Sequence, residues 1–300
     1  MSVKKTVETI AILMPGDMGH GCATAFRQNG FRVITCLDGR SARTKNLAAA
    51  AGLEDLPSLG NVVSTADLIL SILPPEFAVT QALAVAAEMR RLEIYPDYVD
   101  CNAISPVTAA EVAAAFADTP ANFVDGGIIG VNPVREEGRT RLYVSGGDTA
   151  LVCQLDGRGM DVRAIGEAVG RASAMKMIYA SSTKGAFSLY AAVAVMAELA
   201  GLREEVFAEF AQSKPATLSA IENMVPRIPL DAKRWIFEMD EIARTYEGFG
   251  MTPHFHKGAS DIMRLANKTP LAAETRETAR DDRDIAEVLQ IYVDALQNKS

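Results

Sequence analysis

The sequence predicts two structural classes in one chain: an α/β domain with a doubly wound, mainly parallel sheet, followed by an all-α domain. Three observations predict this organisation. Short β-branched runs alternate with alanine-rich segments of helical spacing up to about residue 170. The early runs are apolar almost throughout, as strands covered on both faces require. Beyond that point the strand signals stop, so we expect domains at residues 1–168 and 169–300.

Six strands are expected in the first domain, each an apolar or β-branched run bounded by turn residues. They cover residues 6–14, 31–37, 66–73, 97–103, 122–130 and 139–147. Helices are expected between them at residues 18–28, 41–50, 76–91 and 105–117. Alternating strands and helices predict parallel strand pairs whose crossover helices cover both faces of the sheet.

The second domain is expected to begin with one long helix. Residues 172–201 contain no proline and only one glycine before the last residue, which predicts a helix of about thirty residues. Further helical segments follow it. We expect breaks between them at Pro215, Pro226, Pro229, Pro253 and Pro270.

Composition restricts the class of function. The 300 residues carry a net charge of −8, and no cluster of Lys and Arg offers the basic face that nucleic acids need. The apolar stretch at residues 189–202 is too short and too rich in alanine to span a membrane. Without CxxC spacing or the layout of a secretory signal, we expect a cytoplasmic protein with a small-molecule substrate and four free thiols. These cysteines are Cys22, Cys36, Cys101 and Cys153.

The segment ILMPGDMGHG, residues 12–21, joins the first strand to the first helix, where a Rossmann domain carries its GxGxxG turn. Gly16 and Gly19 match the second and third glycines, whereas Met14 replaces the first. The amides of Gly16, Asp17, Met18 and Gly19 would open the helix and receive a phosphate. The Asp17 carboxylate would repel that phosphate unless it turns back to cap the helix. The alternative interpretation is a plain strand-to-helix turn.

The end of the second strand predicts which dinucleotide binds. Asp38 has the spacing expected for the acid that bonds an adenine-ribose hydroxyl, which favours NAD. Arg40, Ser41 and Arg43 follow, and a basic pair with a hydroxyl suits the 2′-phosphate of NADP. We favour NADP, with NAD as the alternative. Otherwise, Ser41 caps a helix and the two arginines are solvated.

Six motifs lie along the chain in a defined order: PGDMGHG, SILPP, VDCNAISP, FVDGGIIG, LYVSGG and GRASAMKMIYA. With them the chain resembles the β-hydroxyacid dehydrogenase and 6-phosphogluconate dehydrogenase superfamily over nearly its whole length. Within it, the chain resembles the branch whose C-terminal domain is phosphogluconate-dehydrogenase-like and of unknown function. The resemblance implies a Rossmann domain, a helical substrate and dimerisation domain, and a homodimer.

The resemblance also implies roles for individual residues. Leu73, Pro74 and Pro75 would line the ribose side of the cofactor, and Asn102 would lie near the nicotinamide and the substrate. Gly130 matches a substrate-binding turn.

Lys176, in GRASAMKMIYA, falls where the family places its catalytic lysine. A lysine early in a buried helix loses solvation, so its pKa should fall and it would exchange a proton with the substrate during hydride transfer. The alternative is a surface lysine whose stem lies along apolar neighbours.

The chain departs from the family pattern at three positions. Ile129 replaces the hydroxyl of the substrate-binding turn, Ala180 replaces an asparagine, and a later lysine is replaced near Glu238. We expect other residues of the long helix to contact the substrate instead; they are Tyr179, Thr183 and Lys184.

His254 and His256 have a strand-like spacing, and no carboxylate is placed to complete a metal site. We therefore expect no metal, and assign these histidines to a domain interface or to the substrate pocket.

Two functions are compatible with these observations. The first is an NAD(P)-dependent oxidoreductase that interconverts a secondary alcohol, such as a 3-hydroxy acid, and a ketone, with Lys176 as general acid and base. A reductase of a C=N bond is a chemical variant of it. The second is a non-catalytic NAD(P)-binding or sensing protein, suggested by Met14, Asp17 and Ala180. A sensor does not need a proton-transfer lysine, so Lys176 favours the enzyme.

Overall fold

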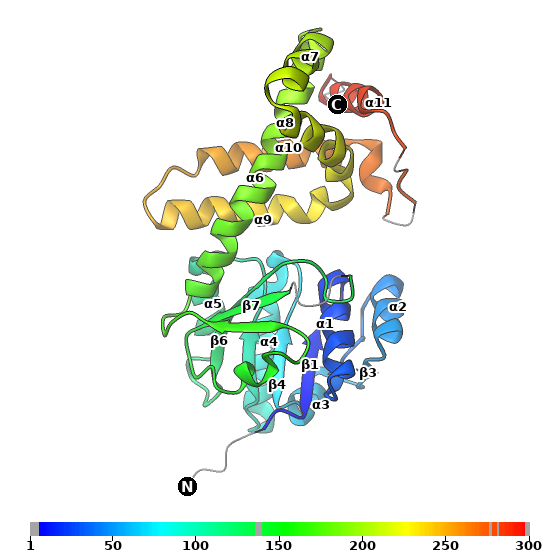
Figure 1. The fold of residues 1–300 in the computed structure, drawn as a ribbon. Helices are drawn as coiled ribbons and strands as arrows, with labels where there is room; N and C mark the ends of the chain where they lie inside the picture. Colours follow the sequence, from blue (N-terminus) through cyan, green and yellow to red (C-terminus); the bar gives the residue numbers. More distant parts are fainter. Residues whose placement is uncertain (1–5, 136–139, 276–277, 281, 298–300) are drawn as a thin grey trace. The chain divides into compact units, whose positions relative to one another are not determined.

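The computed structural model describes residues 6–135, 140–275, 278–280 and 282–297 (Figure 1). The chain divides into two compact units, residues 1–177 and 178–300, and the division falls inside helix α6 (Arg171–Leu199).

The first unit is built on one eight-stranded sheet (Figure 1). The strand order is β3-β2-β1-β4-β5-β6-β7-β8, and every neighbouring pair is parallel except β6 and β7. This topology confirms the predicted α/β class with a doubly wound, mainly parallel sheet. The strands are β1 (Thr9–Leu13), β2 (Arg32–Thr35), β3 (Glu54–Asp55), β4 (Leu68–Ser71), β5 (Asp97–Asp100), β6 (Phe123–Ile129), β7 (Arg141–Ser145) and β8 (Asp161–Ala164).

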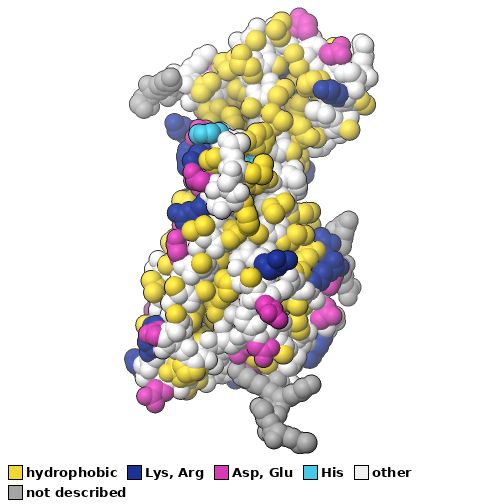
Figure 2. Space-filling model, turned by 90° about the vertical axis from the view of Figure 1, so that its left-hand side faces the viewer, with side chains coloured by type: hydrophobic (Ala, Val, Ile, Leu, Met, Phe, Trp, Pro, Cys, Tyr) yellow, Lys and Arg dark blue, Asp and Glu magenta, His cyan; other side chains and the backbone are white. Residues whose placement is uncertain are grey.

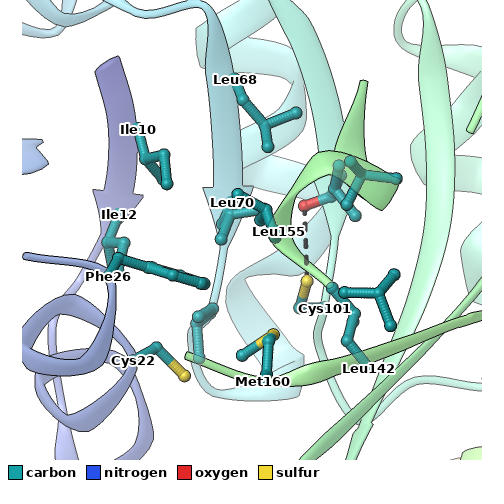
Figure 3. Close-up of a cluster of buried hydrophobic side chains, with 14 of the residues drawn as sticks. Ile10, Ile12, Cys22, Phe26, Leu68, Leu70, Cys101, Leu142, Leu155 and Met160 are labelled. Atoms are coloured by element: carbon teal, nitrogen blue, oxygen red, sulfur yellow. Dashed lines mark hydrogen bonds between the residues drawn. The ribbon is translucent and has the colours of Figure 1, made fainter. Parts of the chain in front are cut away.

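Helices cover both faces of this sheet. They are α1 (Asp17–Gln28), α2 (Ala42–Ala51), α3 (Leu59–Thr65), η1 (Pro75–Phe77), α4 (Ala78–Leu92), α5 (Pro106–Ala114) and η2 (Val152–Leu155). Strand β1 buries apolar side chains on both faces of the sheet, so helices are needed on each face. Ile10 and Ile12 pack with Phe26 of α1 on one face (Figure 3), whereas Ala11 and Leu13 belong to the core formed with α3, α4 and α5 on the other. Successive side chains of a strand point to opposite faces, so all four are buried.

Four elements of this unit were not predicted from the sequence: β3, β8, α3 and the short η2. Strands β3 and β8 lie at the two edges of the sheet, where each pairs with a single neighbour. Edge strands need no continuous apolar run, and both residues of β3 are exposed. Helix α3 has only seven residues, too few for a clear helical periodicity. In the expected strand at residues 139–147, position 139 lies outside the described residues.

The second unit is entirely helical in the described residues (Figure 1). Beyond α6 it contains α7 (Arg203–Ser213), α8 (Pro215–Met224), η3 (Val225–Arg227), α9 (Ile228–Gly248), α10 (His254–Lys268), η4 (Pro270–Ala273) and α11 (Ile285–Gln297). The long first helix and the breaks at prolines are confirmed. Pro215 and Pro270 begin their elements, Pro226 and Pro229 lie in the first turns of η3 and α9, and Pro253 is the N-cap of α10. Among the described residues, no helix is long and apolar enough to cross a membrane.

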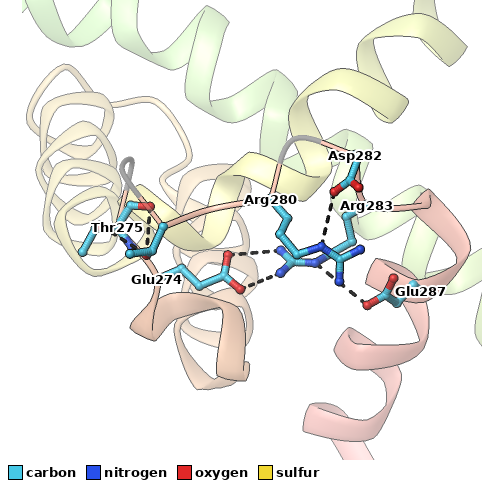
Figure 4. Close-up of polar contacts among 7 residues, drawn as sticks. Glu274, Thr275, Arg280, Asp282, Arg283 and Glu287 are labelled. Carbon is cyan, nitrogen blue, oxygen red and sulfur yellow. Dashed lines mark hydrogen bonds and ion pairs between the residues drawn. The ribbon is translucent and has the colours of Figure 1, made fainter.

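An arginine anchors the segment that precedes α11 (Figure 4). The Arg283 side chain is 8% exposed and bonds Glu274 at 2.6 Å, with Glu287 at 4.0 Å. The hydrogen bond to Glu274 raises the pKa of the guanidinium. This pairing connects η4 to the start of α11.

Candidate functional site

The candidate site lies where the strand order of the sheet reverses. β1 has β2 on one side and β4 on the other, so the connections that follow β1 and β4 leave in opposite directions. In doubly wound sheets, ligands bind in the crevice at the carboxyl ends of the strands at this position. Residues 14–19 follow β1 and residues 73–75 follow β4, so both predicted cofactor segments begin at this edge.

The turn after β1 keeps its geometry although the first glycine is missing. Met14 has φ 53°, in the left-handed region that glycine normally occupies. The Gly16 amide donates to the Met14 carbonyl at 2.7 Å, which closes the turn. Met14 therefore adopts the glycine-like conformation at a cost of about 1–2 kcal/mol.

The N-terminus of α1 is open in the way a phosphate site requires. Gly16 is its N-cap, and within the described chain no side chain caps it, whereas serines cap α2, α3 and α5. The Asp17 carboxylate pairs with Arg43 at 2.8 Å, and the arginine offsets its charge. A Cβ on Gly19 would lie 3.3 Å from Ile12, so glycine lets helix and strand pack closely. These residues fit a pyrophosphate on the first-turn amides, which include that of Met18.

The residues predicted to bind the adenine ribose have different environments. Asp38 is exposed, and Ser41 caps α2 by accepting the Thr44 amide at 3.2 Å. Arg40 donates from Nη2 to Gln81 of α4 at 3.4 Å, and its buried Nε has no hydrogen-bond partner among the described residues. An unpartnered guanidinium donor fits an anionic ligand such as a 2′-phosphate.

Asn102 is buried at the end of β5, and its amide holds the loop after β4. Its Oδ1 accepts the Leu73 amide at 2.7 Å, and its Nδ2 donates to Asp100 at 2.7 Å and to Ser71 at 3.1 Å. Both ends of the side chain are therefore engaged within the protein. Its geometry supports the conformation of Leu73, Pro74 and Pro75, the first and third of which are buried.

Asp100, the last residue of β5, accepts hydrogen bonds from the backbone and side-chain amides of Asn102. Burial raises the pKa of this carboxyl to about 7, although two hydrogen bonds from Asn102 oppose the rise. The negative charge of Asp125 raises it further. Asp100 and Asp125 are register partners on the parallel strands β5 and β6, so the two acids are neighbours.

Lys176 lies against β6. Its Nζ donates to the Ile128 carbonyl, and a Cβ on Gly127 would come within 3.0 Å of the Lys176 Cβ. Burial raises the pKa of the nearby Cys101 thiol, and the positive charge of Lys176 opposes that rise. The helix approaches the strand this closely because Gly127 has no side chain. Lys176 is thus partly buried beside the carboxyl half of β6, and Gly130, with φ 122°, directly follows that strand.

The other predicted substrate residues lie on the part of α6 that belongs to the second unit. Tyr179 is 44% exposed, and the Thr183 hydroxyl donates to the Ala180 carbonyl at 3.1 Å. Lys184 forms an ion pair with Glu238 at 2.7 Å, and the two side chains are 13% and 3% exposed. Glu238 thus pairs with a lysine of α6.

The interpretation of the His254–His256 spacing as strand-like is wrong, because both residues lie in the first turn of helix α10. His256 is 4% exposed, and its ring centroid lies 4.3 Å from that of Tyr246. Its buried Nδ1 has no hydrogen-bond partner within the described part of the chain, and burial lowers its pKa. No group of three or more His, Cys, Asp or Glu side chains that could hold a metal ion occurs in the described ranges.

The sequence analysis did not identify Asn132, which follows β6 and contacts the first turn of α1, where the phosphate is expected to bind. Its Nδ2 donates to the Asp17 carbonyl, and its Oδ1 accepts the Val134 amide at 2.9 Å. A Cβ on Gly21 would come within 1.9 Å of this side chain, so α1 needs glycine there. The last glycine of PGDMGHG, Gly21, was the sequence signal that another side chain packs closely on this part of α1.

Comparisons with known proteins agree with this architecture. Residues 9–155 match the family described as the NAD binding domain of 6-phosphogluconate dehydrogenase, and residues 197–266 match a domain of unknown function, DUF1932. An uncharacterised 28.5 kDa protein from Methanothermus fervidus is 28% identical over 181 residues, 60% of this chain and 68% of that protein.

Two solved structures share the fold over nearly the whole chain. The 3-hydroxyisobutyrate dehydrogenase of Mycobacterium tuberculosis, solved with L-serine, has a TM-score of 0.64 at 21% identity and covers 95% of this chain and 99% of its own. A reductive aminase from Aspergillus terreus, solved with NADPH and ethyl-5-oxohexanoate, has a TM-score of 0.55 at 18% identity. That alignment covers 96% of this chain and 100% of the aminase.

Proposed function

Because the chain belongs to the 6-phosphogluconate dehydrogenase superfamily, in the branch with a helical domain of unknown function, we propose that it is an NADP-dependent oxidoreductase. Its substrate is a small molecule in which a secondary alcohol, such as that of a 3-hydroxy acid, is interconverted with a ketone. The observation that carries the proposal is the position of Lys176. It is partly buried beside β6, in the same unit as the predicted phosphate-binding turn at residues 14–19.

The residues of the first unit would divide the binding of the cofactor among them. The first-turn amides of α1 would bind the pyrophosphate, and residues 73–75 would hold the ribose beside the nicotinamide. Arg40 would bind the 2′-phosphate, which supports NADP over NAD. The NADPH in the reductive aminase structure is compatible with this choice. Asn102 acts by keeping the loop after β4 in place.

Lys176 would move the proton of the reaction. The bound nicotinamide supplies or accepts the hydride. In alcohol oxidation the neutral Lys176 amine accepts the hydroxyl proton, and in ketone reduction its ammonium donates a proton to the carbonyl oxygen. Gly130, which belongs to the same unit as Lys176, is proposed to contact the substrate. Lys184 is assigned at most to binding, since its ammonium already pairs with Glu238.

The test is to replace Lys176 by a residue of similar length that cannot ionise. Lys176→Met should lower turnover by roughly two to four powers of ten, the usual range for general acid–base catalysis, and leave NADPH affinity unchanged. Activity is followed by nicotinamide absorbance with hydroxy acids, alcohols, carbonyl compounds and imines, each with NADP(H) and NAD(H).

Lys184→Met is the control on the same helix. It should change thermal stability and apparent substrate affinity but leave turnover within a few-fold, because Lys184 pairs with Glu238. If folded Lys176→Met protein keeps its turnover and folded Lys184→Met protein loses it, Lys184 rather than Lys176 would be the proton-transfer residue. NADPH binding without turnover of any substrate would favour a sensing protein instead.

A further inference from the structure

The carboxylate of Asp125, on β6, lies at the start of α6. It is fully buried, and its Oδ2 accepts the amides of Gly170 at 2.9 Å, Ala172 at 2.9 Å and Ser173 at 3.1 Å. The Ser145 hydroxyl donates to the same oxygen at 3.0 Å. Asp125 thus accepts three amides from the beginning of one helix, although it lies 45 residues before the first of them.

This arrangement is a helix cap supplied by the sheet. The first amides of a helix have no partner within the helix and carry the positive end of its dipole, so a carboxylate there is stabilising. Helix α5 shows the usual local solution, in which Ser105 accepts the Thr108 amide at 3.1 Å. Helix α6 uses a charged residue of β6 instead, and this choice ties the helix to that strand. The Ser173 hydroxyl adds a bond to Asp125 Oδ1 at 2.5 Å.

Lys176 follows Ser173 by three residues, so it lies one turn beyond the capped amides. A Cβ on Gly127 would lie 2.7 Å from the Ala172 carbonyl, so the same turn packs directly on β6. The Ile128 carbonyl accepts a hydrogen bond from Lys176 Nζ. Strand β6 therefore contacts this turn at three successive places: a charged cap at Asp125, a close approach at Gly127 and a carbonyl at Ile128.

We propose that Asp125 is a positioning residue for Lys176: its carboxylate fixes the first turn of α6 so that the lysine ammonium stays at the Ile128 carbonyl. This proposal rests on the proposed function only in its catalytic consequence.

The experiment compares Asp125→Asn with two other variants. Asp125→Asn keeps the size of the side chain but removes the charge, and Ser173→Ala removes one donor while leaving the carboxylate in place. The control is Ser58→Ala, which removes the serine cap of α3 in the same unit, where Ser58 accepts the Asn61 amide at 3.2 Å. Amide hydrogen exchange of residues 170–177 is measured by mass spectrometry. The rate at which an amine-reactive reagent labels Lys176 is measured as a function of pH.

In Asp125→Asn, exchange in residues 170–177 should accelerate by roughly tenfold to a hundredfold, as expected for lost hydrogen bonds to a charged group. The pH midpoint of Lys176 labelling should shift. Ser173→Ala should produce smaller changes of the same kind, and Ser58→Ala should leave both measurements unchanged. If the enzyme is active, Asp125→Asn should lower kcat and displace its pH profile while the KM for NADPH is retained.

Unchanged exchange and labelling in a folded Asp125→Asn protein would overturn the proposal, as would equal effects in Ser58→Ala. Neither measurement requires turnover. A protein that shows the expected exchange and labelling but oxidises or reduces nothing would therefore refute the proposed function and retain Asp125 as the residue that positions Lys176.

Discussion

At the scale of single residues, Met14 shows how a motif can lose a glycine and keep its turn. The residue has φ 53° and packs partly against the apolar core of the α3, α4 and α5 face. Asparagine tolerates this left-handed conformation, whereas a β-branched side chain does not.

Met14→Val should therefore have a lower free energy of unfolding than Met14→Asn, by about 1–2 kcal/mol, even though valine preserves more apolar packing. Chemical denaturation of the two variants measures the difference. Equal stabilities, or a more stable valine variant, would show that the strain at this turn is released by movement of the backbone.

Arg40 is the residue on which cofactor choice is predicted to depend. NADPH should bind more tightly than NADH, and Arg40→Ala should remove most of that difference by losing about 1.5–3 kcal/mol for NADPH, the value for a hydrogen bond to a charged group. Fluorescence titration with both cofactors provides the measurement.

Arg43→Ala is the matched control for Arg40→Ala. Arg43 pairs with Asp17 at the start of α1, so its loss should weaken both cofactors by removing a positive charge from beside the Asp17 carboxylate, where the pyrophosphate is expected to bind. Equal affinities of the unmodified protein for NADPH and NADH would contradict the NADP assignment and favour Asp38 as the ribose ligand.

At the scale of elements, the pairing of α9 with α10 buries an ionisable ring. His256 of α10 packs on Tyr246 of α9, and the Tyr246 hydroxyl lies 2.9 Å from that of Ser181. Lys257 of α10 pairs with Glu247 of α9 at 3.8 Å, and Lys184 of α6 pairs with Glu238 of α9 at 2.7 Å. Burial lowers the pKa of His256, so the folded state holds this proton less tightly than the unfolded state.

The sign of the pH dependence follows from that shift. As pH falls through the ordinary histidine pKa of about 6.5, the unfolded state binds more protons than the folded state, so the free energy of unfolding should decrease. Above that pH the contribution of His256 should be constant. The measurement is urea denaturation between pH 5 and 8, about the range in which histidine titrates, with His256→Gln as the control. A decrease of the same size in the glutamine variant would assign the effect to another group.

At the scale of the whole molecule, the helical unit exposes much apolar surface. Figure 2 shows hydrophobic side chains gathered over this unit, and helix α7 contains no buried residue. The exposed fractions of Leu189, Met196 and Leu202 are 49%, 61% and 49%. Surface of this kind is typical of an interface.

A homodimer is therefore predicted, with a second copy covering this surface. Light scattering at micromolar concentration should give twice the mass of the 32.1 kDa chain, and Met196→Glu should shift the mass toward that of one chain. As a control, Phe77→Glu introduces the same charge at an exposed apolar position of the first unit and should leave the mass unchanged. A single-chain mass for the unmodified protein would refute the prediction.

The sequence alone determined the class of the fold and the order of its main elements. Continuous apolar runs such as β1 and β4, and a long proline-free segment such as α6, are local patterns that few structures satisfy. The local cap at Ser41 was also readable, because a capping serine bonds an amide three residues away.

Only the tertiary structure decided what depends on neighbours distant in sequence. The edge strands β3 and β8 form by pairing with β2 and β7, which requires no pattern of their own. The sequence identified Asn102 and Lys184 as candidate binding residues. It could not show that Asn102 bonds the Leu73 amide or that Lys184 pairs with Glu238, because these partners lie far away in the sequence. Asp125 lies within the motif FVDGGIIG, but no local pattern points to its role, because the amides that it caps begin 45 residues later and meet it only when α6 packs on β6.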